Sequence, residues 1–83
     1  MRKEVIDMIV VEFYINRNGE LVNPCGSDHT HIMRDLKTAR GARNRVTAKG
    51  YCIPKDAVEC RIFRTNNPAS DKGQVLLDSF KVN

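Results

Sequence analysis

Two histidines and the nearby cysteines are the residues of this chain whose types could hold a metal ion. Cys25, His29 and His31 lie close together in the sequence, and Cys52 or Cys60 could supply a fourth ligand. Zinc binds four nitrogen or sulfur ligands in a tetrahedron, so the residue types fit. The spacing Cys-x3-His-x-His, however, matches none of the common zinc fingers. Cys60 is also expected on the inner face of a strand, where a thiol is usually a small buried apolar group. We therefore predict no metal and no cofactor.

The same segment contains the residue types for nucleophilic catalysis. Cys25 would be the nucleophile and His29 or His31 the base, near a helix N-terminus that would lower the pKa of the thiol. The alternative is a helix-capping segment with two exposed histidines. The sequence contains no paired-carboxylate motif, phosphate-binding loop or serine elbow. We therefore predict no catalytic residues and expect that the protein is not an enzyme.

Positive charge is concentrated in residues 34–49, RDLKTARGARNRVTAK, which hold six basic residues and one acid. On a helix that turns by about 100° per residue, the apolar side chains of this region gather on one side. They are Ile32, Leu36, Ala39, Ala42 and Val46. Arg34, Lys37 and Arg45 fall on the opposite side, with a gap at Gly41. Such a cationic stripe favours an anionic partner.

The predicted binding surface consists of this stripe and the basic residues beside it. Its members are Arg34, Lys37, Arg40, Arg45 and Lys49. Residues 34–64 carry a net charge of +6 and the remainder −2, within a formal net charge of +4. A solvated helix face in a basic protein would show the same pattern, so that interpretation stays open. The functional interpretation is a surface that docks on phosphate or on acidic protein.

The N-terminal half of the chain predicts a β-hairpin. Residues 8–16 (MIVVEFYIN) are rich in β-branched and aromatic types, and alternate side chains form a uniformly apolar face. These side chains are Ile9, Val11, Phe13 and Ile15. Asn18-Gly19 favours a type I′ turn, because both positions tolerate positive φ. Residues 20–22 would form the return strand.

Two more strands are predicted after the basic segment. Residues 58–64 (VECRIFR) alternate, with Val58, Cys60 and Ile62 on one face. Residues 74–82 (QVLLDSFKV) form the last strand, antiparallel to the previous one.

A helix is predicted from residue 29 or 30 to about residue 48. Residues 27–30 supply N-cap candidates, and Gly50 is a candidate C-cap. Gly41 costs about 1 kcal/mol relative to alanine inside a helix. Arg43 falls within the apolar arc if the helix is continuous. Both residues predict either a bend or an arginine stem that lies along the edge of the core.

The order of these elements predicts an α+β fold. We expect a single domain, residues 1–83, with a three- to four-stranded antiparallel sheet and one helix packed across one face, in the order β-β-α-β-β. A chain of this size buries only about 60% of the surface of its unfolded form, which favours a protein that presents a surface over one with a deep cleft. The predicted core consists of Ile9, Val11, Phe13, Leu36, Ala39, Val46, Ile62 and Phe80.

The number of cysteines and the N-terminal sequence together predict the cellular compartment of the protein. Three cysteines do not fit a closed disulfide framework and favour a reducing environment. The start MRKEVIDMIVVEFYI is interrupted by acids and lacks a cleavage pattern, so no signal peptide is predicted. No apolar run is long enough to cross a bilayer. A cytoplasmic protein without membrane contact is expected.

The pattern of elements resembles the small β-α-β-β proteins encoded by bacteriophages, which include several anti-CRISPR proteins. The resemblance covers residues 8–82 and rests on a strand IVVEFYI, a helix DLKTARGARNRVTA and a final pair ECRIFR and VLLDSF. It implies inhibition by binding, in which a compact protein sits on a bacterial nucleoprotein complex. This chain is basic whereas many such inhibitors are acidic. Contact with guide RNA, target DNA or acidic protein is therefore expected, rather than mimicry of nucleic acid.

Two functions follow as hypotheses. The first is an inhibitor that docks on a bacterial protein or nucleoprotein defence complex, in the cytoplasm of the host cell. The alternative is a free-standing accessory protein that binds the DNA or RNA backbone, with Gly41 allowing close approach and Asn44 and Thr47 bonding to phosphate. Stacking on bases is disfavoured because Tyr14 and Phe63 lack the surrounding motif of a ribonucleoprotein domain.

Overall fold

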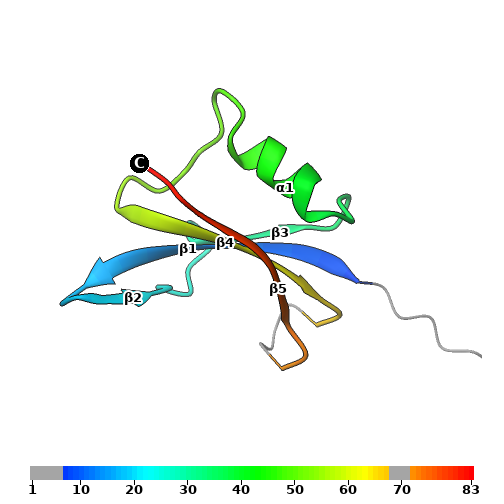
Figure 1. Ribbon diagram of the computed structural model, residues 1–83, viewed down its shortest axis with the longest axis horizontal. Coiled ribbons are helices and arrows are strands. Elements are labelled where there is room, and N and C mark those ends of the chain that lie inside the picture. Colours follow the sequence, from blue (N-terminus) through cyan, green and yellow to red (C-terminus); the bar gives the residue numbers. More distant parts are fainter. Residues whose placement is uncertain (1–6, 68–71) are drawn as a thin grey trace, which may run out of the picture.

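The computed structural model describes residues 7–67 and 72–83, which form one antiparallel sheet with a helix on one face (Figure 1). The elements are β1 (Met8–Arg17), β2 (Glu20–Val22), β3 (Thr30–Met33), α1 (Ala39–Val46), β4 (Ala57–Thr65) and β5 (Val75–Lys81). The predicted α+β class, with an antiparallel sheet and one helix, is confirmed. The predicted order and strand number are wrong: the sheet has five strands and the order is β-β-β-α-β-β.

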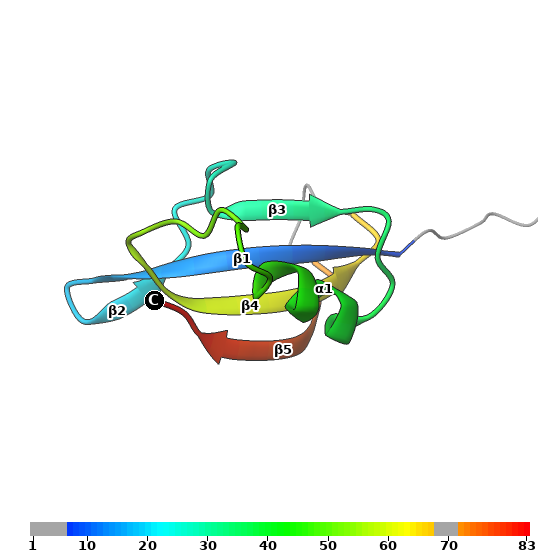
Figure 2. The ribbon, with the colours of Figure 1, turned by 90° about the horizontal axis from the view of Figure 1, so that it is seen from above.

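Strand β1 is the centre of the sheet because it pairs with three other strands. The strand order is β2-β1-β4-β5, and β3 pairs with β1 on the edge that β2 also uses. Along that edge β3 lies opposite residues 9–12 and β2 opposite residues 15–17. Figure 2 shows β3, β1, β4 and β5 side by side. The predicted hairpin turn is confirmed, since Asn18 has φ 55° and Gly19 has φ 85°.

The first part of the predicted helix is strand β3. Met33 pairs with Ile9 and His31 with Val11, so these two side chains face α1. Ile32, expected on the apolar side of a helix, points to the other face and is 44% exposed. The four residues THIM are too few to distinguish the helical period of about 3.6 residues from the strand period of 2. Their hydrogen bonding to β1 makes them a strand.

Helix α1 is shorter than predicted and begins with a threonine cap. Thr38 is the N-cap, and its Oγ1 accepts a hydrogen bond from the backbone N–H of Gly41 at 3.1 Å. A Cβ at Gly41 would lie 3.2 Å from this hydroxyl and 3.5 Å from Cδ2 of Leu36. The space beside Gly41 is thus filled by the protein itself and is no approach for a nucleic-acid backbone. The helix ends with Thr47 as C-cap instead of Gly50.

The hydrophobic core lies between α1 and the sheet. Ala42 and Val46 of the helix are buried against side chains of β1 and β4 such as Phe13 and Ile62. Every member of the predicted core lies in this cluster, either buried or partly buried. Its buried members are Ile9, Val11, Phe13, Met33, Ala42, Val46, Ala57, Cys60 and Ile62.

A β-bulge changes the predicted inner face of β4. Tyr14 pairs with Glu59 and Ile15 pairs with Ala57, which leaves Val58 as an extra residue. Ala57 takes the buried position, and Val58 is 39% exposed. The predicted placement of Val58 beside the buried residues of β4 is therefore wrong.

Phe13 is expected to carry a large share of the stability because its ring is completely buried in the core. Replacing Phe13 with alanine should reduce the free energy of unfolding by about 3–5 kcal/mol, measured by urea denaturation. Leu76→Ala, at a side chain that is 53% exposed, is the matched control and should cost less than about 1 kcal/mol. Equal losses in the two variants would contradict the described register of β1.

Candidate functional site

Residues 34–49, which we call the cationic layer, cover one face of the sheet as a loop, a helix and a turn (Figure 1). Arg34 and Lys37 lie in the loop before the helix, ahead of the N-cap Thr38, whereas Arg45 lies within α1. The predicted stripe along one helix is therefore wrong, since two of its three cations precede the helix.

The two cations of the loop reach the start of β1. The guanidinium of Arg34 lies 3.9 Å from the sulfur of Met8, and Nζ of Lys37 donates to the backbone carbonyl of Asp7 at 3.2 Å. Neither contact is an ion pair, so both positive charges lack a counter-charge among residues 7–67 and 72–83. The contacts hold the loop close to β1.

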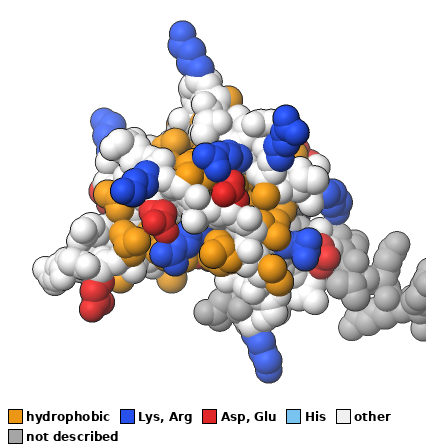
Figure 3. All heavy atoms as spheres, in the orientation of Figure 1, with side chains coloured by type: hydrophobic (Ala, Val, Ile, Leu, Met, Phe, Trp, Pro, Cys, Tyr) orange, Lys and Arg blue, Asp and Glu red, His pale blue; other side chains and the backbone are white. Residues whose placement is uncertain are grey.

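Arg40 and Lys49 are the other cations of the cationic layer that form no ion pair with a residue that the structure describes. Arg40 lies in the first turn of α1 and Lys49 follows the helix, and both are exposed. The side chain of neither residue forms a hydrogen bond or an ion pair within the described part of the chain. Figure 3 shows Lys and Arg side chains over the upper half of the molecule, where α1 and its flanking segments lie in Figure 1.

Arg45 is compensated by the one acid of the layer. Its two terminal nitrogens donate to the carboxylate of Asp35 at 3.0 and 2.6 Å. These hydrogen bonds, followed by a backbone hydrogen bond, lower the pKa of Asp35, so the carboxylate is ionised at neutral pH. The sequence could not reveal this pair because the two residues lie ten positions apart across the helix cap.

Arg43 is directed toward the edge strand β5 instead of toward solvent. Its Nη1 lies 3.0 Å from a carboxylate oxygen of Asp78, and its guanidinium stacks 4.4 Å above the ring of Phe80. This matches one of the two arrangements expected for Arg43, with the side chain at the edge of the core. Its charge is compensated within the fold.

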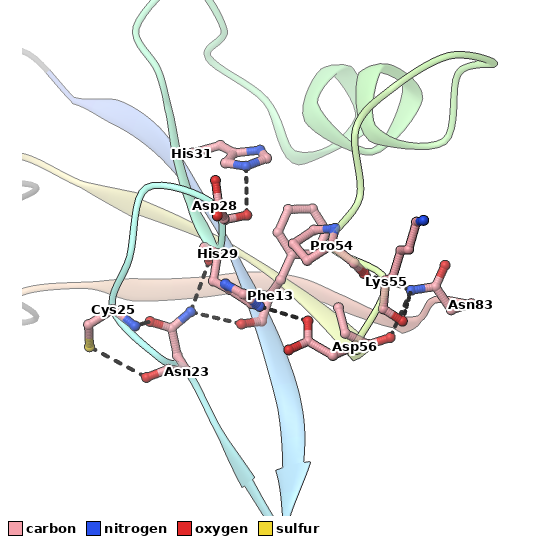
Figure 4. A network of polar contacts seen from close by, with 11 residues as sticks. Phe13, Asn23, Cys25, Asp28, His29, His31, Pro54, Lys55, Asp56 and Asn83 are labelled. Carbon is pink, nitrogen blue, oxygen red and sulfur yellow. Dashed lines mark hydrogen bonds and ion pairs between the residues drawn. The ribbon is translucent and has the colours of Figure 1, made fainter.

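A hollow of about 370 Å³ lies between the start of β3 and the segment that leads into β4. Among its lining residues are both histidines, Cys52 and Asp56. Nε2 of His29 lies 2.9 Å from a carboxylate oxygen of Asp56, which joins the two segments (Figure 4). The sequence singled out His29 and Cys52 but gave no sign of Asp56, which is brought there by the fold.

His31 is occupied on both ring nitrogens. Nε2 lies 3.1 Å from the carbonyl oxygen of Asp28, and because a carbonyl only accepts, Nε2 carries the proton. Nδ1 then accepts from the hydroxyl of Tyr51 at 2.6 Å. The ring also packs edge-on against Phe13, at 5.1 Å between centroids. His31 thus ties the segment after α1 to the sheet and has no free nitrogen for a base.

The cysteines are not joined to the histidines. The thiol of Cys25 lies 3.4 Å from the carbonyl oxygen of Asn23 and is directed away from both imidazoles (Figure 4). Burial raises the pKa of Cys60 to about 12, so its thiol is protonated at neutral pH and a poor nucleophile. Within residues 7–67 and 72–83, no three His, Cys, Asp or Glu side chains are grouped to hold a metal ion.

The face of the sheet opposite α1 carries a polar network that the sequence did not predict. The hydroxyl of Tyr14 donates to Glu12 at 2.6 Å, and the guanidinium of Arg61 stacks 4.3 Å above the Tyr14 ring while it bonds to Glu59. Burial first, and then the hydrogen bond to Glu12, raise the pKa of Tyr14 to about 12. Strand alternation gives the face of each residue, but only the register of β1 with β4 brings them together.

Comparison with protein-family models, curated proteins and solved structures finds no match to this chain. In the described ranges, no helix has the length and apolar character needed to span a membrane.

Asn23 joins the two short strands on the same edge of β1. Its side-chain nitrogen donates to the carbonyls of Phe13 at 2.8 Å and His29 at 2.9 Å (Figure 4). Its side-chain oxygen accepts from the backbone N–H of Cys25 at 2.9 Å. The amide therefore continues the sheet hydrogen bonding across the gap between β2 and β3, and it positions the segment that carries His29.

Asn23→Asp is expected to destabilise the protein by about 1–3 kcal/mol, because it keeps the shape but removes both donors and leaves a carboxylate beside two carbonyls. Urea denaturation at neutral pH would measure the change. Asn44→Asp, at an exposed position of α1, is the control with the same chemistry and should change stability by less than about 0.5 kcal/mol. If both variants match the parent, the Asn23 hydrogen bonds contribute nothing.

Proposed function

We propose that this protein is a small binding protein whose cationic layer docks on an anionic surface of a macromolecular partner. One observation carries the proposal: four basic side chains of the layer form no ion pair within the described part of the chain. They are Arg34, Lys37, Arg40 and Lys49. The one acid in the layer is already paired. Phosphate or carboxylate groups of a partner would supply the missing counter-charges.

The layer is suited to docking because its backbone is fixed to the sheet. Ala42 and Val46 are buried beneath it, and Thr38 caps the helix. Beyond the helix, the hydrogen bond of Tyr51 to His31 fastens the chain to β3. A partner would therefore not have to order this segment, which lowers the entropic cost of binding.

The partner we propose is a bacterial nucleoprotein defence complex, which the protein would inhibit in the manner of anti-CRISPR proteins in the host cytoplasm. The support is the pattern of a long strand, a basic helix and a closing strand pair, found as β1, α1, β4 and β5. A basic inhibitor is complementary to a complex that exposes RNA, DNA or acidic protein. Enzymatic activity forms no part of the proposal.

Free nucleic acid is the second candidate, because the same four cations would attract phosphate. The aromatic rings argue for the first candidate, since base stacking needs an accessible ring. Arg61 covers Tyr14, and Arg43 covers Phe80. Phe63 is half-buried on the face away from the layer. Affinity for free strands would then depend on phosphate contacts alone.

A pair of charge-reversal variants tests the cationic layer. Arg40→Glu/Lys49→Glu should reduce partner binding at least about tenfold, whereas Arg17→Glu/Lys55→Glu should change it little. Both double variants alter the net charge equally, and all four positions are exposed. Stability should change by less than about 0.5 kcal/mol for each substitution. Binding would be measured by quantitative affinity capture from bacterial lysate and by titration of random duplex DNA.

The two assays separate the two candidates. A free-standing nucleic-acid binder should hold duplex DNA at physiological salt, and four phosphate contacts give a log–log salt slope of about −4. An inhibitor should ignore free duplex under these conditions and capture a nucleoprotein complex that the layer variant loses. Equal losses in the two double variants would mean that net charge alone governs binding, and the layer would be rejected.

Asp35→Asn is expected to strengthen binding to an anionic partner. The substitution removes the carboxylate that compensates Arg45, so one more cation becomes available. In titrations of duplex DNA at low salt, the salt slope should steepen by about one unit. Asp28→Asn makes the same charge change outside the layer and should leave the slope unaltered. An identical slope in both variants would contradict a role of Arg45 at the binding surface.

A further inference from the structure

A second hollow lies at the end of the sheet where β2, the start of β4 and the end of β5 meet. It has a volume of about 510 Å³ and is lined by Leu21, Val58, Glu59, Lys81, Val82 and Asn83. Leu21 is 42% exposed and Val58 39%, so two branched apolar side chains border it from different strands. Glu59 and Lys81 each lie next to a residue that packs on the core, the buried Cys60 and the partly buried Phe80, so their side chains and the hollow lie on the face away from α1.

A positive charge that has no ion pair within the described residues borders this hollow. The register of β4 and β5 places Lys81 directly opposite Glu59. The carboxylate of Glu59, however, is bonded to Arg61. The ammonium group of Lys81 has no hydrogen bond or ion pair with any residue of the described ranges. Among the residues described, the hollow therefore combines an apolar wall with one ammonium group that forms no ion pair.

The rim of the hollow is held in place by hydrogen bonds. The backbone N–H of Val82 donates to the carbonyl of Val58 at 3.1 Å. The side-chain nitrogen of Asn83 donates to the carbonyl of Pro54 at 2.8 Å and to the carbonyl of Ala57 at 2.9 Å. Figure 4 labels Asn83 and Pro54. These contacts fix the chain after β5 against the start of β4. A ligand would therefore meet a preformed site.

We propose that this hollow binds a small organic monocarboxylate with an apolar body. The body would contact Leu21 and Val58, and the carboxylate would pair with the ammonium group of Lys81. The volume falls within the range of about 300–1,000 Å³ that is usual for small-molecule sites. Lys81 is the one cation among the described residues that line the hollow; it matches a single negative charge and disfavours an amine. The site is independent of the proposed docking function, because it lies on the opposite face from the cationic layer.

Hexanoate is the probe, with hexan-1-ol and hexylamine as matched ligands of equal chain length. Amide chemical shifts of the full chain would be followed by ¹H–¹⁵N correlation spectra during titration. Hexanoate should shift Leu21, Val58 and Lys81 saturably, about fivefold more tightly than hexan-1-ol, with hexylamine weakest. Lys81→Met keeps the aliphatic stem and should abolish the preference for hexanoate over the alcohol. Lys55→Met, in the other hollow, should retain it.

Three results would overturn the proposal. One is a lack of saturable shifts at the hollow in the parent protein. Another is hexanoate shifts centred on Arg40 and Lys49, which would mark unspecific attraction to the cationic layer. The third is an unchanged acid-over-alcohol preference in Lys81→Met. The ligand preference of the parent protein tests the site even if a variant folds poorly, and the spectrum of each variant reports its fold directly.

Discussion

The pairing of β1 with β4 is the interaction on which the rest of the structure depends. It runs from Met8 to Ile15 of β1, and it sets Phe13 opposite Cys60 and Val11 opposite Ile62. These side chains form the floor on which α1 packs. An isolated helix as short as α1 would not be stable in water, because too few hydrogen bonds follow its nucleation. The cationic layer therefore has a defined shape only because this strand pair lies beneath it.

What could be predicted from the sequence depends on local signals. The apolar alternation of β1 and the Asn18-Gly19 turn need no distant partner, and both lead to the observed hairpin. The core was predictable for the same reason, since inward residues such as Phe13, Val46 and Ile62 repeat with the period of their own element. The position of Arg43 in the apolar arc likewise predicted two arrangements, a bend or a side chain at the edge of the core, and the structure has the second.

The errors arise where distant pairing decides the outcome. Residues 30–33 are too few to show a period, and their strand conformation comes from hydrogen bonds to β1 some twenty residues earlier. The bulge at Val58 is likewise a property of two strands in register. The pairing of charges was the feature that the sequence predicted least well. Asp78 lies 35 positions from Arg43, so a count of charges along the chain cannot tell that this arginine is compensated.

The placement of acids gives the two faces of the sheet different electrostatic character. On the face away from α1, the Arg61 guanidinium is bonded to Glu59, and the hydroxyl of the neutral Tyr14 donates to Glu12. On the helix face, the acids Asp35 and Asp78 each hold one arginine, and the neighbouring cations form no ion pair within the described ranges. An extended anionic surface would therefore be attracted mainly to the helix face. Complementarity of this kind orients a partner during its approach, before any close contact forms. The fold thus gives the charge a direction that the net charge of the chain alone does not specify.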